Sequence, residues 1–525
     1  MHFSISDTQL IKEQNNSYVT YSIAINGVHH CSLRYRQLFN FHQQLKKTFG
    51  TNSLPLFPPK RFLPLTASQT EERRAQIEKY IQFVSQDQRI SNSELFNGFF
   101  LNGQQESQSV AIEEVILDVY HPNLHSIKVK VYSTDRTDVV LDAVAKSLDL
   151  SPQLVPYFNL FVVQRLDSDC IPKRKLHNFE SPYLTMKTMN SVDNNHVIII
   201  RKSYWDPVFD DDLISDRIAI NVLYLQTLYD IEKGLIEANK DIRRQLSSLH
   251  AKGSKQDYLQ LARTLKYYGY IHFQPCFCDY PQNNTRVLIA GGGRELNLRA
   301  YTPSEQMKEY SFRVTRIRCW RLTTSLQDNL NGCALNANGS DSNGVGSSSS
   351  SSGGSSCQTN SSTSTTRYEL SFEYLLSKDQ LQWITIISDQ AILMSVCLQG
   401  MVEELLMKRN GKKLCRQDMT HNSGCVNGNN NNSRRGSWSY MKRDGSSHQI
   451  SLPRSVSTDT DLTNNSSAAD FRSRVSKSLS SSSSTASSST SRTNSSHSNG
   501  LPVKSRHFVE NDAFNGIGDI GDDDL

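Results

Sequence analysis

Leu54-Pro-Leu-Phe-Pro58-Pro59-Lys60-Arg61 is a proline-rich loop that ends on two cations, and it decides the fold of the first hundred residues. Arg34-Tyr35 precedes this loop, and Arg73-Arg74 follows it at the start of an amphipathic helix. An arginine grips a phosphate with two charge-assisted hydrogen bonds, and a lysine supplies a compact point charge. Because three segments supply such groups, the set predicts a domain that holds one polyanionic headgroup at a membrane surface.

The helix that carries Arg73-Arg74 has clear start signals. Thr66 and Ser68 are each followed three residues later by a capping-box partner, Gln69 and Glu71 respectively. An apolar stripe at helical spacing follows, formed by Ile77, Tyr80, Ile81 and Val84. The alternative interpretation of the arginine pair is a solvated charge on an ordinary helix.

The order, spacing and local structure of this set resemble the phox-homology (PX) domain, a phosphoinositide-binding module. The resemblance implies that Arg34 holds the 3-phosphate of phosphatidylinositol 3-phosphate and that Tyr35 packs against the inositol ring. It also implies that Lys60 reaches the 1-phosphate and that Arg73 hydrogen-bonds the ring hydroxyls. Arg36 departs from the family, which usually has serine after the aromatic residue, and leaves the fine lipid specificity open.

Composition sets further limits on function. A chain of 525 residues has room for three or four domains, and a net charge of +5 does not indicate bulk nucleic-acid binding. The first residues lack the basic region and apolar run of a signal peptide, and no stretch has the length of a membrane-spanning helix. We therefore expect a cytoplasmic protein that is peripheral on early endosome membranes, the location that the PX resemblance implies.

Catalytic and metal chemistry have no support in the sequence. Cys276-Phe-Cys278 is the one close pair among ten cysteines, and no second pair or histidine pair follows at zinc spacing. Gly291-Gly-Gly293 lacks the pattern of a phosphate-binding loop and is interpreted as a hairpin turn. We expect no catalytic residue, no metal and no cofactor.

Alternating and helical patterns divide residues 1–409 into four units, and the fold class is α+β multidomain. Residues 1–108 contain a hairpin over 18–33 with an Asn26-Gly27 turn. On the proline-rich loop, Phe62, Leu63 and Leu65 form either a membrane-dipping tip or a packed loop.

The other three units follow in order. Residues 110–203 have the ββα-then-β order of a ubiquitin-like fold, with a helix that starts at Thr137 or Asp138. Residues 206–272 are helical. Residues 273–409 are rich in strands, including a long one over 310–322, and end in a helix over 390–408. This last pattern predicts a lobe like a phosphotyrosine-binding (PTB) or pleckstrin-homology (PH) domain.

Ubiquitin-like, helical and PTB-like lobes in that order resemble a FERM domain, and a PX domain directly before them indicates the PX-FERM sorting nexins. The resemblance is carried by Arg201-Lys-Ser-Tyr-Trp-Asp206 and by the stretches 312–320 and 372–379. In this family the third FERM lobe binds Asn-Pro-x-Tyr or Asn-x-x-Tyr/Phe motifs of receptor tails, as a strand added between a sheet edge and the terminal helix.

The resemblance places Trp320 on the edge strand of that groove and Val402 and Leu406 on the facing helix. The alternative is that all three are core residues. No arginine pair is placed for a phosphotyrosine, so we expect recognition that does not depend on phosphate.

Two segments are rich in Ser, Asn, Gly and Thr: the insert 327–366 and the tail 410–509. Neither can bury enough apolar surface to offset chain entropy, so we expect both to be disordered. Residues 510–525 are acidic. One interpretation of this acidic segment is a tail that increases solubility. The last six residues resemble the sorting nexin terminus that engages the Retriever recycling complex; they are Ile520, Gly521, Asp522, Asp523, Asp524 and Leu525.

The resemblance therefore implies an endosomal cargo adaptor that returns receptors to the plasma membrane and keeps them from lysosomes. The implied cargoes are integrins and lipoprotein-receptor relatives. Two alternatives are a FERM scaffold that links receptors to the cytoskeleton or to a small GTPase, and a PX-bearing lipid enzyme. The enzyme would need a catalytic constellation that the sequence does not offer.

Overall fold

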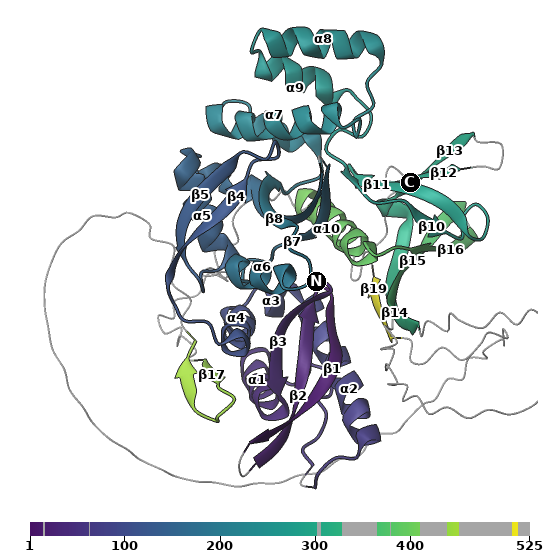
Figure 1. Cartoon of the computed structure of the whole chain (residues 1–525). Helices are drawn as coiled ribbons and strands as arrows, with labels where there is room; N and C mark the ends of the chain where they lie inside the picture. The colour runs from purple at the N-terminus through teal and green to yellow at the C-terminus, as the bar shows by residue number, and fades with distance from the viewer. Residues whose placement is uncertain are drawn as a thin grey trace, which may run out of the picture.

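The described residues form four units in chain order and two short segments from the C-terminal region (Figure 1). The computed structural model describes residues 1–13, 16–61, 63–167, 169–301, 306–327, 365–377, 380–409, 438–450 and 507–512. Most of the insert 327–366 and all of residues 520–525 lie outside this part of the chain.

The first domain is a three-stranded antiparallel sheet packed against helices. Its elements are β1 (Phe3–Glu13), β2 (Asn16–Ile25), β3 (Val28–Arg34), α1 (Tyr35–Phe49), α2 (Ala67–Gln86), α3 (Gln88–Ser91) and α4 (Glu94–Gln108). Asn26 and Gly27 both have positive φ, 50° and 79°, which confirms the predicted hairpin turn. The predicted capping box is also confirmed, because Thr66 and Gln69 bond each other's backbone at the start of α2.

The second unit has the topology of ubiquitin. Its elements are β4 (Glu114–Tyr120), β5 (Ser126–Tyr132), α5 (Thr137–Leu148), η1 (Pro152–Tyr157), β6 (Phe158–Leu166), β7 (Asp169–Lys175), α6 (Pro182–Asn190) and β8 (His196–Lys202). The sheet order is β5-β4-β8-β6-β7, with β4 and β8 parallel and the other pairs antiparallel. We call this unit the ubiquitin-like lobe.

The helical lobe follows and lies at the top of Figure 1. Its elements are η2 (Pro207–Asp212), α7 (Arg217–Glu232), α8 (Lys240–Ala251) and α9 (Lys255–Arg263). Its core is continuous with that of the ubiquitin-like lobe, since Tyr204, Leu223 and Tyr258 belong to one buried cluster with Val144 and Leu160.

The third lobe is a strongly bent sheet covered by one long helix. Its elements are β9 (Ile271–His272), β10 (Cys276–Cys278), β11 (Thr285–Gly292), β12 (Glu295–Tyr301), β13 (Met307–Arg313), η3 (Val314–Arg316), β14 (Ile317–Gln327), β15 (Thr365–Ser377), β16 (Gln380–Ile387) and α10 (Ala391–Arg409). The sheet order is β13-β12-β11-β10-β16-β15-β14-β19, where β19 (His507–Asp512) comes from the C-terminal region.

The prediction of one continuous strand over 310–322 is wrong. A single 3-10 turn, η3, breaks it, and the Val314 amide donates to the Arg294 carbonyl at 2.8 Å. The break turns the chain from one part of the sheet to another, so that β13 pairs with β12 whereas β14 pairs with β15 and β19. Apolar alternation continues across the turn, which is why the sequence pattern does not reveal it.

The first domain and the ubiquitin-like lobe are joined by a buried polar interface. Arg174 of β7 donates from Nη1 to the Ile25 carbonyl at 3.1 Å and from Nη2 to both Glu180 oxygens at 2.6 Å. Phe179 packs into the core of the first domain. Two contacts therefore cross between the units: the Arg174 hydrogen bond to Ile25, with Arg174 held by Glu180 of its own lobe, and the Phe179 ring in the core of the first domain.

The described helices include none with the length and apolar character needed to cross a membrane. Within the same residues no group of three or more His, Cys, Asp and Glu side chains is placed to hold a metal ion.

Candidate functional site: a headgroup set and a sheet edge

The structure brings Tyr35 and Arg73 together at the proline-rich loop. The Arg73 guanidinium carbon lies 4.3 Å from the centre of the Tyr35 ring, and Arg73 Nη2 donates to the Pro59 carbonyl at 3.2 Å. The Tyr35 hydroxyl donates to the neighbouring Pro58 carbonyl at 2.7 Å. Burial raises the pKa of Tyr35, so the phenol keeps its proton and its role as a donor.

Lys60 and Arg34 each lie over another aromatic ring of the first domain. Lys60 Nζ lies 4.1 Å from the centre of the Phe39 ring, which in turn stacks on Tyr35 at 6.0 Å. The Arg34 guanidinium carbon lies 3.7 Å over the Tyr18 ring. We call Arg34, Tyr35, Lys60 and Arg73 the headgroup set; it comes from the end of β3, the start of α1, the loop and the first turns of α2.

The two arginines that open α2 have different roles. Arg74 is buried, and its Nη1 donates to the Ile5 carbonyl at 2.6 Å and to Glu78 Oε2 at 2.9 Å. It also pairs with Glu71 at 2.8 Å. Arg74 therefore ties α2 to β1, whereas Arg73 lies against Tyr35 and belongs to the headgroup set.

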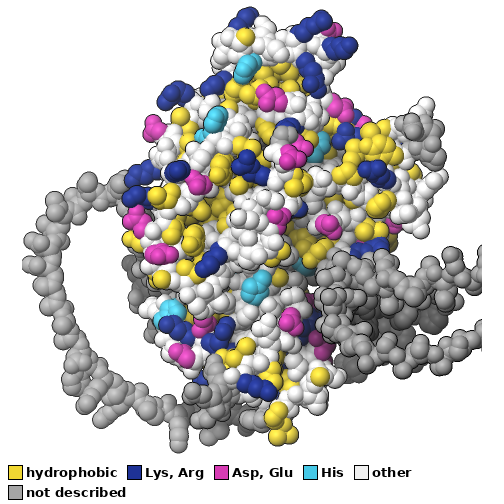
Figure 2. Space-filling model, viewed as in Figure 1, with side chains coloured by type: hydrophobic (Ala, Val, Ile, Leu, Met, Phe, Trp, Pro, Cys, Tyr) yellow, Lys and Arg dark blue, Asp and Glu magenta, His cyan; other side chains and the backbone are white. Residues whose placement is uncertain are grey.

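Apolar side chains project from the loop that carries Lys60. Leu56 is 98% exposed and Leu63 is 81% exposed, whereas Leu65 is half-buried. Phe62 lies outside the described residues. Figure 2 shows hydrophobic and basic side chains close together at the lower end of the molecule, where Figure 1 places the first domain. The exposure of Leu56 and Leu63 favours the membrane-dipping alternative.

The outer edge of β14 is occupied by a strand from the C-terminal region. β19 pairs antiparallel with β14 from Cys319 opposite Asp512 to Thr324 opposite His507 (Figure 1). Strand addition at a sheet edge is a known mode of peptide recognition, in which main-chain hydrogen bonds supply the affinity. The β14 edge is thus competent to accept an extended peptide.

The structure places Trp320 beneath α10, in the core. Its side chain is 3% exposed, and its Nε1 donates to Ser395 Oγ at 2.9 Å. Val402 is buried in the same cluster, and Leu406 packs against that cluster while half-buried. Because a helix rises about 1.5 Å per residue, Val402 and Leu406 lie roughly 10 and 16 Å along the axis from Ser395. The three predicted residues are not brought together, and their contact with a peptide stays a prediction.

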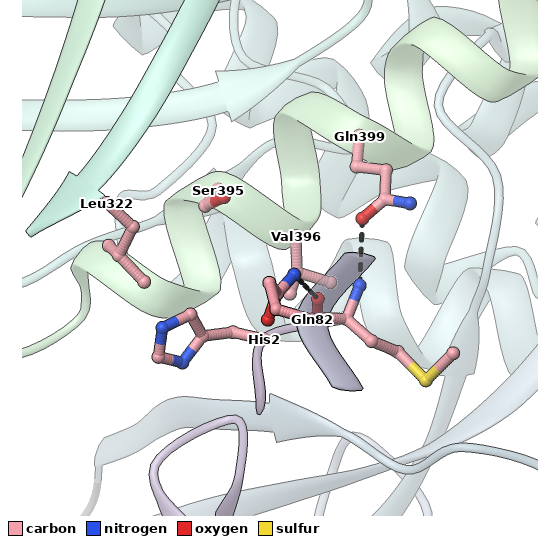
Figure 3. A pocket seen from close by; sticks show the side chains of 7 residues that line it. His2, Gln82, Leu322, Ser395, Val396 and Gln399 are labelled. Atoms are coloured by element: carbon pink, nitrogen blue, oxygen red, sulfur yellow. Dashed lines mark hydrogen bonds between the residues drawn. The ribbon is translucent and has the colours of Figure 1, made fainter. Parts of the chain in front are cut away.

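The first half of α10 is the part that faces β14 and the first domain. Figure 3 shows Ser395, Val396 and Gln399 on one face of the helix, with Leu322 of β14 to one side. The Met1 ammonium donates to Gln399 Oε1 at 2.8 Å. The cavity between them holds about 10 Å³, room for about one water molecule, so no small-molecule site is built here.

A larger cavity of about 520 Å³ lies where the first domain, the ubiquitin-like lobe and α10 meet. Its lining mixes the cations Lys175 and Arg201 with the carboxylates Glu403 and Glu404. The Glu404 carboxylate accepts from the Trp205 and Asp206 amides at 2.7 Å. Leu406 lines this cavity, whereas Trp320 of β14 does not.

Two ordered segments were not predicted within 410–525. Residues 438–450 form a hairpin on the first domain, and residues 507–512 form β19. The sequence carries a signal for the first, because Asp444-Gly445 is a typical hairpin turn and lies between the apolar residues Tyr440 and Ile450. The predicted recruitment motif at Ile520–Leu525 lies outside the described residues.

Family models match the described units in chain order. The PX domain model matches residues 21–102. Models of the sorting nexin 17/27/31 FERM F1 lobe and the sorting nexin 17/31 FERM F2 lobe match residues 115–205 and 206–266. The sorting nexin 17 FERM C-terminal domain model matches residues 269–340 and 349–406. The first domain is therefore called the PX domain below.

Curated relatives agree with these matches. The chain is 46% identical to sorting nexin-17 of Danio rerio over 79% of this chain and 84% of that protein. It is 43% identical to human sorting nexin-17 over 78% of this chain and 83% of that protein. It is 31% identical to human sorting nexin-31 over 78% and 86% of the two chains. With a PX domain and a FERM domain of the sorting nexin-17 type, the chain belongs to the PX-FERM sorting nexins, which are adaptors and not enzymes.

Proposed function

We propose that this protein is an endosomal adaptor that holds a phosphoinositide headgroup with its PX domain and a receptor tail at the β14 edge. The observation that carries the proposal is the pairing of β14 with β19, which demonstrates that this edge takes an added antiparallel strand. The headgroup set lies in a different domain of the same structure. One molecule therefore has separate surfaces for lipid and for peptide.

The lipid half of the proposal rests on the headgroup set and the loop tip. We assign Arg34 to the 3-phosphate of phosphatidylinositol 3-phosphate, Lys60 to the 1-phosphate, Tyr35 to the inositol ring and Arg73 to its hydroxyls. The exposed Leu56 and Leu63 lie near Lys60 on the same loop and add apolar contact with the bilayer. This geometry supports attachment to early endosomes, where that lipid is the expected ligand.

The peptide half rests on register and sequence. Asn511 of β19 lies opposite Trp320, and it begins Asn511-Asp-Ala-Phe514, which has the spacing of an Asn-x-x-Phe motif. The chain's own C-terminal segment thus matches the class of peptide that we propose as cargo, the Asn-Pro-x-Tyr or Asn-x-x-Tyr/Phe motifs of integrin and lipoprotein-receptor tails. A receptor tail must displace β19 to bind.

The output of the adaptor is assigned to the acidic terminus. We propose that Ile520–Leu525 recruits a Retriever-type recycling complex, so that the bound receptor returns to the plasma membrane and avoids lysosomal degradation. The free carboxylate and apolar side chain of Leu525 suit capture by a basic pocket on a partner.

Removal of residues 507–525 is expected to raise the affinity for an Asn-Pro-x-Tyr peptide about tenfold. The tethered β19 segment competes for the β14 edge at an effective concentration of about 1 mM. With an intrinsic Kd of about 100 μM for that edge, β19 occupies it about nine-tenths of the time. Calorimetric titration of the two proteins with one peptide measures the change.

The matched control is removal of residues 520–525 alone, which leaves β19 in place and should leave peptide affinity within about twofold. If the longer deletion binds the peptide no better than the full chain, or loses it, the β14 edge is not the receptor site.

A further inference from the structure

Residues 438–450 form a closed β-hairpin, which we call the tail hairpin. Its strands are β17 (Ser439–Met441) and β18 (Ser447–Gln449). The Ile450 amide donates to the Trp438 carbonyl at 2.8 Å, and the Lys442 amide donates to the Ser446 carbonyl at 2.7 Å. Gly445 takes the turn at φ +96°, a conformation that other residues rarely adopt.

Apolar contacts seat the tail hairpin on α1 and α4 of the PX domain. Tyr440 is 1% exposed, and its ring lies 5.6 Å from that of Phe99. Ile450 is buried against Gly98, where an added Cβ would overlap Ile450 Cγ2. Both tail residues belong to the core cluster of the PX domain, so the hairpin completes that core.

Polar contacts give this docking a fixed register. The Glu106 carboxylate accepts from the Tyr440 hydroxyl at 2.7 Å and from the Arg443 amide at 2.6 Å. The Gln44 side chain accepts from the Ser439 amide at 2.8 Å and donates to its carbonyl at 2.7 Å, as a neighbouring strand would. Buried groups satisfied in this way specify one arrangement and penalise others.

The tail hairpin also reaches the residue assigned to the 3-phosphate. Arg34 Nη1 donates to the Arg443 carbonyl at 2.7 Å, and Arg443 Nη2 donates to the Ser32 carbonyl on β3 at 2.9 Å. Gln37 adds a second link, since its Oε1 accepts from the Arg34 amide at 2.9 Å and its Nε2 donates to the Met441 carbonyl at 2.9 Å. The backbone and side chain of Arg34 are both tied to the hairpin.

We propose that the tail hairpin positions Arg34 for the phosphate of a phosphoinositide headgroup, so that lipid affinity depends on residues 438–450. The inference rests on the proposed lipid-binding function. A guanidinium has five N–H donors, and the bond to Arg443 uses one of those on Nη1. The Nε and Nη2 edge makes no hydrogen bond to any residue that the structure describes, and it is the edge that forks onto a phosphate.

The size of the effect follows from side-chain ordering. A long side chain that is already held in its bound conformation does not lose rotamer freedom when the ligand arrives, which is worth about 2- to 10-fold in affinity per side chain. Displacement of the tail hairpin should therefore weaken headgroup binding by about that factor. This is a smaller loss of affinity than the one expected when Arg34 itself is replaced by alanine.

Gly98→Ala tests the proposal in the full chain. The three atoms nearest to an added Cβ all belong to Ile450, and alanine favours a helix interior, so the change opposes hairpin docking without breaking α4. Gly98→Ala with Ile450→Ala restores room, because it removes the Ile450 Cγ2 and Cδ1 atoms at 2.1 and 3.7 Å and leaves Ile450 Cβ at 3.5 Å, an ordinary contact distance. Tyr440→Ala displaces the hairpin from the tail side, without a change in the PX domain.

Two measurements are made on each variant. Hydrogen exchange at the Ser439, Arg443 and Ile450 amides reports docking, and co-sedimentation with vesicles that contain phosphatidylinositol 3-phosphate, against vesicles with unmodified phosphatidylinositol, reports lipid binding. We expect Gly98→Ala and Tyr440→Ala to lose amide protection and to bind the first vesicles about 2- to 10-fold more weakly. The double variant should recover both.

The outcomes separate the two proposals. If the full chain does not prefer the phosphorylated lipid, the proposed lipid function fails, and the positioning role falls with it. If the full chain binds and Arg34→Ala does not, yet the undocked variants bind as well as the full chain, the positioning role alone is refuted. Tighter binding by the undocked variants would show that the tail hairpin obstructs the headgroup, which also overturns the proposal.

Discussion

Arg34→Ala is expected to weaken binding to vesicles with phosphatidylinositol 3-phosphate by at least about 30-fold. Truncation of one partner of a buried, charge-assisted hydrogen-bond pair costs about 2 kcal/mol or more, and each 1.4 kcal/mol is a factor of ten. The Arg34 side chain is held over Tyr18 and against the Arg443 carbonyl, so its loss also removes a preorganised group. Vesicle co-sedimentation at fixed salt measures the change.

Arg36→Ala is the matched control. Arg36 lies two residues after Arg34 and is exposed, and its substitution removes the same charge. We expect it to weaken binding by less than about threefold, the effect of one rim charge. Equal losses in the two variants would mean that the PX domain attracts anionic membranes through its net charge and that Arg34 holds no specific phosphate.

Glu180→Ala is expected to destabilise the protein by about 3–5 kcal/mol, since it leaves a buried guanidinium without its counter-charge. The Arg174 and Glu180 side chains are 3% and 0% exposed. Glu180 also accepts from the His177 amide at 2.8 Å, and Arg174 donates to Ile25 across the interface with the PX domain. Urea unfolding, followed by circular dichroism, measures the loss.

Glu114→Ala is the matched control, because it removes a carboxylate from an ion pair that is exposed to solvent. Lys130 and Glu114 lie 3.1 Å apart with side chains 75% and 56% exposed, and such surface pairs contribute about 1 kcal/mol or less. If Glu180→Ala unfolds at the same urea concentration as Glu114→Ala, the buried Arg174–Glu180 pair does not contribute the predicted stability.

Local signals predicted much of the fold. The Asn26-Gly27 turn, the Thr66–Gln69 capping box and the ubiquitin-like order of strands each depend on neighbouring residues, which a sequence displays directly. The break at η3 depends instead on a hydrogen bond to Arg294, from another hairpin. No local pattern marks that turn, and the prediction of one strand over 310–322 failed there.

The roles of individual site residues were harder to predict. Arg73 and Arg74 are adjacent and chemically identical, yet a rotation of about 100° along the helix puts one by the headgroup set and the other against β1. Trp320 lies on the predicted edge strand but points beneath α10, to Ser395. Which face a residue occupies follows from tertiary packing, which the sequence pattern leaves open.

The two ordered segments beyond residue 409 show the same limit. Both lie in a region dominated by serine and asparagine, whose composition predicts no core of its own. Each segment is ordered because it packs on a surface that is distant in sequence. Tyr440 and Ile450 of the tail hairpin pack against α1 and α4, and β14 forms main-chain hydrogen bonds with β19. Amino-acid composition alone predicts whether a segment can fold in isolation, and it does not predict folding against another part of the chain.

We expect one molecule of this protein to bind lipid and receptor peptide together on one membrane. Binding of the full chain is measured with vesicles that carry phosphatidylinositol 3-phosphate, a membrane-anchored Asn-Pro-x-Tyr peptide, or both. Because the second contact forms at a high effective concentration, the vesicles with both components should bind at least about tenfold more tightly than either single-component vesicle. Binding no tighter than to the better single-component vesicle would show that the lipid and peptide surfaces do not act together in one molecule.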